Sequence, residues 1–145
     1  MGSDARLSCS ASGPAWMMAL SDDEALGLVA KQGLGSPAEY GPNAPASMQA
    51  VLHMVHDARA RGYSLTQETY TAGLNAMAAP VRLAGQPPLG IISIAGPTVR
   101  FTEERMLALG PELVSFAAQL AAASGASPFF SQRAQPQDRQ PIYAA

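Results

Sequence analysis

The chain has 145 residues and a formal net charge of −2, from 9 Lys or Arg against 11 Asp or Glu. This length corresponds to about one domain of typical size. The small negative charge argues against direct contact of this chain with a nucleic-acid backbone. A single cysteine, Cys9, excludes an intrachain disulfide and is typical of a reducing cytoplasm. The longest strongly apolar stretches, residues 89–95 and 113–123, are shorter than the roughly 18 residues that span a bilayer, so no membrane segment is expected.

Two short helices are predicted near the N-terminus. Residues 12–20 form the first, with Ser12 near its cap and Pro14 in its first turn, where a missing N–H costs nothing. Residues 21–33 form the second, because Ser21 and Glu24 have the spacing of a capping box.

Two longer helices are predicted from capping residues and apolar spacing. A loop rich in Gly and Pro over residues 33–47 precedes a helix from Ser47 to Gly62. A further helix begins at Thr102, a suitable cap, and runs to Ala123. The apolar residues that recur at helical spacing are Met48, Val51, Leu52, Val55 and Ala58 in the first of these, and Met106, Leu109, Leu113, Phe116 and Leu120 in the second.

A β-hairpin is predicted between these helices. Residues 74–83 and 89–95 have strand-type composition and are separated by a turn-forming segment. Because the second strand is apolar on both faces, it is expected to be the central one. Residues 125–145 are rich in Ser, Gln and Pro and lack apolar periodicity, so a disordered tail is expected there.

No residue set predicts catalysis, a metal site or a cofactor. His53 and His56 lie three residues apart beside Asp57, but no further ligand follows at a recognisable spacing. Three serines surround Cys9 without the glycine pattern of a nucleophile elbow; they are Ser8, Ser10 and Ser12. We therefore expect no catalytic residue.

Residues 59–113 resemble the C-terminal effector-binding domain of IclR-type bacterial transcriptional regulators, and residues 2–16 are similar to the segment of that domain which enters its pocket. The motifs that carry the resemblance are Gly62-Tyr63, Gln67-Glu68, Gly73-Leu74, Ala78-Ala79-Pro80-Val81, Ser93-Ile94-Ala95-Gly96-Pro97 and Thr102-Glu103-Glu104-Arg105. The resemblance implies a GAF-like α+β domain over residues 1–124, with a mainly antiparallel sheet flanked by helices. It also implies a bacterial, cytoplasmic protein that forms dimers or tetramers.

The resemblance further implies that this domain senses a small organic acid or an aromatic metabolite. In the family, the bound effector changes how a helix-turn-helix domain grips operator DNA, and this chain has no such motif. The effector-binding positions carried over are Ala11, Ser12, Gly13, Thr66, Ala76, Ser93 and Ala95. Several depart from common family choices: Thr66 stands for an acid, Ala76 for Cys, Ala95 for Ser and Pro14 for Lys. Fewer polar groups remain to orient a carboxylate, which favours a more apolar effector or weak binding.

The strands and helix that form the first half of the family's effector domain are expected to be missing. A hairpin without its sheet neighbours exposes unpaired backbone groups, and such edges pair with other chains. One alternative is therefore an interaction module that pairs with full-length regulators and binds no effector. Another is a small hydrolase or isomerase that uses Thr66, Glu68 and His56 around the same pocket.

Overall fold

The structure, a computed structural model, describes residues 5–125 and 127. Its elements in chain order are α1 (Ser12–Met17), α2 (Asp22–Gln32), α3 (Met48–Arg61), β1 (Ser64–Gln67), β2 (Leu74–Val81), β3 (Gly90–Pro97) and α4 (Glu103–Ser124). Most of the tail expected over residues 125–145 lies outside the described residues, as do the first four residues of the expected 1–124 domain.

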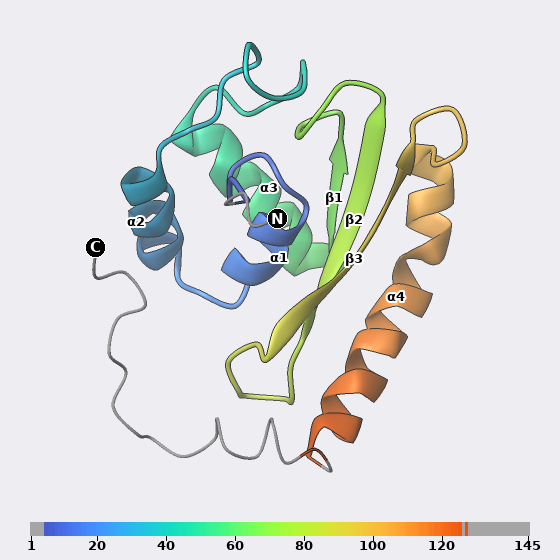
Figure 1. The fold of residues 1–145 in the computed structure, drawn as a ribbon. Coiled ribbons are helices and arrows are strands. Elements are labelled where there is room, and N and C mark those ends of the chain that lie inside the picture. The colour runs from blue at the N-terminus through green and yellow to red at the C-terminus, as the bar shows by residue number, and fades with distance from the viewer. Residues whose placement is uncertain (1–4, 126, 128–145) are drawn as a thin grey trace.

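The elements form layers around one antiparallel sheet (Figure 1). Helix α4 covers one face of the sheet, while α1 and α3 lie on the other face and α2 lies outside them. This arrangement confirms the expected α+β fold with helices flanking an antiparallel sheet.

Three of the four helices begin at the predicted capping residues. The Ser21 side chain accepts a hydrogen bond from the Glu24 N–H while Glu24 reaches back to Ser21, which completes the capping box. Ser47 and Thr102 cap α3 and α4 in the same way, through their side-chain oxygens. Helix α1 differs, because its N-cap is Ala11, which has no side chain to accept a hydrogen bond.

The predicted hairpin is confirmed, but the expected central position of its second strand is wrong. The strand order is β1, β2, β3, so β2 is central and β3 is an edge strand. Strand β1 was not predicted at all and pairs with β2, with Ser64 opposite Ala78. Pro80 of β2 lies beyond the end of β1 and pairs with Ile91 of β3. Although β3 is apolar on both faces, it lies at the edge of the described sheet and is only partly buried.

The two faces of the sheet bury different residues. Met77 and Ala79 of β2 face α4, where they pack with Met106, Leu113 and Ala117. Ala76 and Ala78 face the opposite way, toward Ala11 and Ala15 of the α1 segment. A third apolar cluster joins α1, α2 and α3 away from the sheet, and its buried members are Met17, Ala25, Val29, Val51 and Val55. The alternation along β2 follows from the two-residue period of a strand.

Helix α4 is, within the described residues, the one helix long and apolar enough to cross a membrane by length and composition, with a mean hydropathy of 1.4. The sequence count of uninterrupted apolar residues missed it because Gly110, Pro111 and Glu112 interrupt the apolar run, although the helix continues through them. One side of α4, which carries Met106, Leu113 and Ala117, is buried against the sheet. The helix is therefore a covering element of the fold whose outer side is also apolar.

A polar cluster ties α3 to the N-terminal helices. Asp22 accepts from Arg59 Nη1 at 2.6 Å and contacts His56 Nε2 at 2.8 Å. The Arg59 guanidinium also donates to two backbone carbonyls that follow α1, those of Met18 and Leu20. One arginine thus holds the segment between α1 and α2 against α3.

Acid is expected to weaken this cluster. The hydrogen bond from Arg59, followed by that from His56, holds the pKa of Asp22 below its ordinary value of 3.8. A carboxyl with a lowered pKa in the fold stabilises it above the ordinary pKa, and this contribution is lost as the pH falls through the folded value. From about pH 5 to pH 3, the melting temperature of Asp22→Asn should therefore fall less steeply than that of the unmodified protein.

Asp23→Asn is the matched control for this pH series, because Asp23 lies in the same first turn of α2 and is exposed. Its melting temperature should follow that of the unmodified protein. If the melting temperatures of the unmodified protein and of Asp22→Asn fell in parallel with pH, the cluster would not stabilise the fold.

Candidate effector-binding site

The candidate strand residues lie on one face of the sheet, in adjacent rows. Thr66, Ala76 and Ala95 pair directly across the three strands and form one row. The next row contains Ser93, which pairs with Ala78. Since directly paired residues share a face, all of these side chains project toward the face that α1 covers.

The start of α1 is fixed to this face by two hydroxyl groups. Ser64 is 1% exposed, and its hydroxyl donates to the Ala11 carbonyl. Thr69 donates to the Cys9 carbonyl at 2.5 Å. Sequence reasoning missed Ser64, although it stands two residues before Thr66 and so shares its face. These contacts place Ala11 and Ser12 beside the strand residues of the candidate site.

Gly13 supports this segment and offers no free donor to a ligand. Its N–H already donates within the chain, to Ser10. A Cβ at position 13 would lie 1.8 Å from the Leu7 carbonyl oxygen, a contact that requires glycine. Gly13 therefore shapes the turn that enters α1, and its N–H is already engaged by Ser10.

Two hydroxyl groups on the sheet differ in their availability. Thr66 is 4% exposed and donates its hydroxyl proton to the Ala76 carbonyl at 3.2 Å. Ser93 is exposed, and no hydrogen-bond partner for its hydroxyl is found among the described residues. Ser93 is therefore the strand hydroxyl best placed to bind a ligand.

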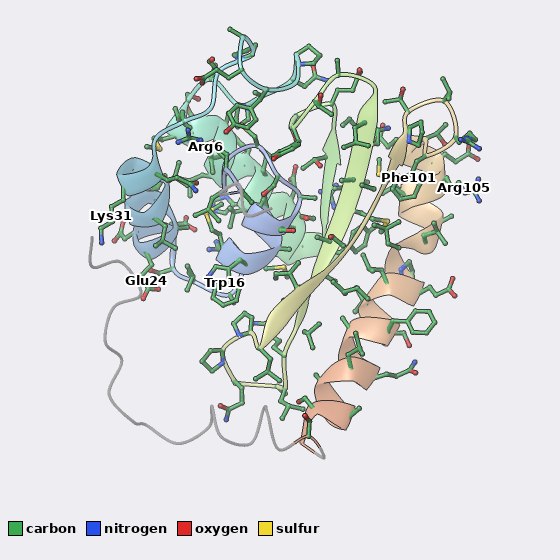
Figure 2. All side chains as sticks on the ribbon, viewed as in Figure 1. Arg6, Trp16, Glu24, Lys31, Phe101 and Arg105 are labelled. Carbon is green, nitrogen blue, oxygen red and sulfur yellow. The ribbon has the colours of Figure 1, made fainter. Side chains whose placement is uncertain are left out.

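The candidate site is an open face and not an enclosed cavity, because both Ser93 and Ala95 are exposed. On the opposite face, which α4 covers, Figure 2 shows Phe101 where β3 leads into α4, and Asn75 donates to its carbonyl at 2.8 Å. A shallow apolar cavity of about 280 Å³ lies at the far end of β3, against α4, and contains none of the candidate residues.

The residues of the enzyme alternative are engaged in three separate contacts. His56 binds Asp22, Glu68 accepts from the Gly73 N–H at 2.8 Å, and Thr66 binds its neighbouring strand. Within residues 5–125 and 127, no group of three or more His, Cys, Asp or Glu side chains could hold a metal ion.

Residues 1–122 match the family model described as bacterial transcriptional regulator IclR C-terminal. The chain belongs to the IclR family. An HTH-type transcriptional repressor of this family, AllR from Salmonella typhimurium, is 30% identical over 128 residues, which are 88% of this chain and 46% of AllR. AllR from Escherichia coli K12 is 31% identical over 114 residues, 79% of this chain and 41% of AllR. The chain thus spans less than half the length of these IclR-type relatives, which are regulators and not enzymes.

Solved structures of IclR-type regulators share the fold. The C-terminal domain of Escherichia coli KdgR aligns with a TM-score of 0.69 at 25% identity, covering 80% of this chain and 69% of that domain. The Agobacterium tumefaciens repressor BlcR aligns with a TM-score of 0.70 at 21% identity, and the alignment covers 80% of this chain and 46% of BlcR. The inducer-binding domain of an Acinetobacter PobR double mutant aligns with a TM-score of 0.70 at 20% identity, and the alignment covers 79% of this chain and 65% of that domain. That protein was solved with 3-hydroxybenzoic acid. The chain is therefore an IclR-type C-terminal regulatory domain.

Proposed function

We propose that this domain senses a small organic acid with an apolar or aromatic body, which binds on the open part of this sheet face, beside the start of α1. The observation that supports this most directly is the shared face of Thr66, Ala76, Ser93 and Ala95, beside Ala11 and Ser12. The double mutant of the PobR inducer-binding domain, which has this fold, was solved with an aromatic acid, and this agrees with the proposal.

The chemistry of the face favours an effector with a large apolar part. The strand residues on this face carry no charged side chain; they are Ser64, Thr66, Leu74, Ala76, Ala78, Pro80, Ile91, Ser93, Ala95 and Pro97. A carboxylate bound here has no Lys or Arg of these strands to pair with, so most of the affinity must come from burial of the rest of the ligand. The exposed Ser93 hydroxyl supplies an orienting hydrogen bond.

In this proposal the domain acts within a cytoplasmic bacterial regulator. Binding of the effector changes how another part of the regulator holds its operator, and this chain makes no contact with DNA. The net charge of −2 agrees with a domain that does not itself bind DNA.

Thermal melts with a panel of aromatic and short aliphatic acids test the proposal. At a hundred times its Kd, a ligand stabilises the fold by roughly 2.7 kcal/mol, which raises the melting temperature by about 5–10 °C for a chain of this length. We expect aromatic acids to give this shift and short aliphatic acids to give little. A cooperative melt that no acid shifts would contradict the sensing role.

Two variants then locate the site. Ser93→Ala should weaken binding of the active acid about tenfold, the equivalent of roughly 1.4 kcal/mol, because it removes the orienting hydroxyl. Ala95→Ser should strengthen binding, because it adds a hydroxyl on the same face. Ser115→Ala, on the exposed side of α4, is the control and should leave the Kd unchanged. An unchanged Kd in Ser93→Ala would place the ligand elsewhere even if the melts show binding.

A further inference from the structure

Trp16 is the one tryptophan of the chain and lies near the end of α1 (Figure 2). Its side chain is 36% exposed. It belongs to none of the three apolar clusters that join the elements in the described part of the chain. An indole ring is among the largest apolar surfaces that a side chain offers. Part of this aromatic surface is thus available for contacts outside the three clusters.

The side of α1 that carries Trp16 follows from the contacts of its neighbours. Ala11 and Ala15 face the sheet, whereas Met17 packs with α2 and α3. At 3.6 residues per turn, Ser12 and Trp16 lie one above the other, on a flank that neither the two alanines nor Met17 occupies. Helix α3 contacts β1, while α1 lies mainly over β2 and β3. The flank of α1 away from α3 therefore borders the part of the sheet face that β3 forms.

The strands beside this flank present small side chains. Ala78 pairs with Ser93, and Ala76 pairs with Ala95. Such residues leave room for a ring but offer little apolar surface of their own. Within α1, β1, β2 and β3, Trp16 is the one aromatic residue. It is therefore the side chain on these elements best suited to cover the apolar body of a ligand.

Two hydroxyl groups near Trp16 are suited to hold the carboxylate of such a ligand. Neither the Ser12 hydroxyl nor the Ser93 hydroxyl has a hydrogen-bond partner among the described residues. Ser12 stands one turn before Trp16, and one helical turn rises about 5.4 Å, which is close to the length of a single-ring aromatic acid. One ligand can therefore place its carboxylate at these hydroxyls and its ring on the indole.

We propose that Trp16 is the specificity-determining residue of this site, and that its indole stacks on the aromatic ring of the effector. This inference rests on the proposed sensing of an organic acid and names the residue that recognises the body of that acid. Stacking of two aromatic rings gains more than the burial of an equal apolar area, whereas a saturated ring gains burial alone. The site therefore favours an aromatic acid over a saturated acid of the same size.

Benzoate and cyclohexanecarboxylate test the proposal, because both carry one carboxylate on a six-membered ring. By titration calorimetry, the unmodified chain should bind benzoate about fivefold more tightly than cyclohexanecarboxylate. Trp16→Leu keeps an apolar side chain, so its two Kd values should lie within about twofold of each other. Trp16→Phe should keep part of the preference. Phe116→Leu, at an exposed aromatic residue of α4 on the other side of the sheet, is the matched control and should keep the full preference.

Tryptophan fluorescence gives a second readout, which a merely structural role of Trp16 would not change. Since the chain has one tryptophan, its fluorescence reports on Trp16 alone. Benzoate should change the intensity with half-saturation at the calorimetric Kd, and cyclohexanecarboxylate should change it less. Far-UV circular dichroism verifies that each variant is folded.

The outcomes separate this inference from the proposed sensing role. If both acids bind and Trp16→Leu keeps the preference for benzoate, the stacking is wrong while the sensing role stands. Equal binding of the two acids by the unmodified chain would likewise overturn the stacking alone. If neither acid binds the unmodified chain and no acid shifts its melting temperature, the sensing role and the stacking are both wrong.

Discussion

Replacing Gly13 by alanine is expected to destabilise the domain by at least about 3 kcal/mol and to lower the melting temperature by about 10 °C. The added Cβ would meet the carbonyl oxygen, carbonyl carbon and Cα of Leu7 at 1.8, 2.6 and 2.8 Å. These are backbone atoms, so no side-chain rotation relieves the contact. The segment that enters α1 must move, and it carries Ala11 and Ser12 of the candidate site with it. Chemical denaturation monitored by circular dichroism measures the loss.

Gly27→Ala is the matched control, because Gly27 lies inside α2 and its Cβ would have no neighbour within 4 Å. Alanine is a better helix former than glycine, so this variant should gain about 0.5–1 kcal/mol. If Gly13→Ala were as stable as the unmodified protein, the close packing of Leu7 on Gly13 would be wrong.

The second large effect is expected for Met77→Ala, which should lower the free energy of unfolding by about 2–5 kcal/mol. Met77 is fully buried in the middle of the central strand and packs in the cluster that binds α4 to the sheet. Its truncation leaves a cavity between the two layers, and the surrounding side chains fill such a cavity only in part. The free energy of unfolding from a urea titration gives the value.

Two controls separate this cavity from a general effect of substitution. Met77→Leu conserves most of the volume and should cost less than about 1.5 kcal/mol. Val99→Ala, at a side chain that is 83% exposed, should change the stability by no more than about 0.5 kcal/mol. A Met77→Ala variant as stable as Val99→Ala would mean that α4 does not pack on β2 as described.

The helices could be predicted from local residues, because the signals that start a helix lie within one turn of it. Ser21 with Glu24, Ser47 and Thr102 each make the capping contact that their position in the sequence predicts. The hairpin of β2 and β3 could be predicted in the same way, because its two strands are neighbours in the sequence and a turn-forming segment joins them. Predicting these elements requires no knowledge of distant parts of the chain.

The position of the strands in the sheet could not be predicted in the same way. Strand β1 has only four residues, and its two buried side chains, Ser64 and Thr66, are polar. Their burial depends on carbonyl acceptors outside β1, at Ala11 in the N-terminal segment and at Ala76 on the neighbouring strand. The apolar pattern of β3 is that of a buried strand, and its edge position follows only from the order of the complete sheet.

For the candidate site, the sequence could select residues that share a face but could not tell which of their polar groups are free. The resemblance selected strand residues that the structure places on one face, since they alternate along each strand. Which polar groups remain free depends on contacts that no pattern reveals. The Gly13 N–H is already used by Ser10, whereas Ser93 has no partner among the described residues.

Pro80 limits how the first two strands can align. In the observed register, Ser64 pairs with Ala78, and Pro80 lies just past the end of β1. A slip of β1 by two residues would place Ser64 opposite Pro80, which has no N–H to donate, and a slip by one residue would turn every side chain to the wrong face. The proline thus disfavours a shift of β1 in this direction, which would move Thr66 away from Ala76 and the hydrogen bond that it makes there.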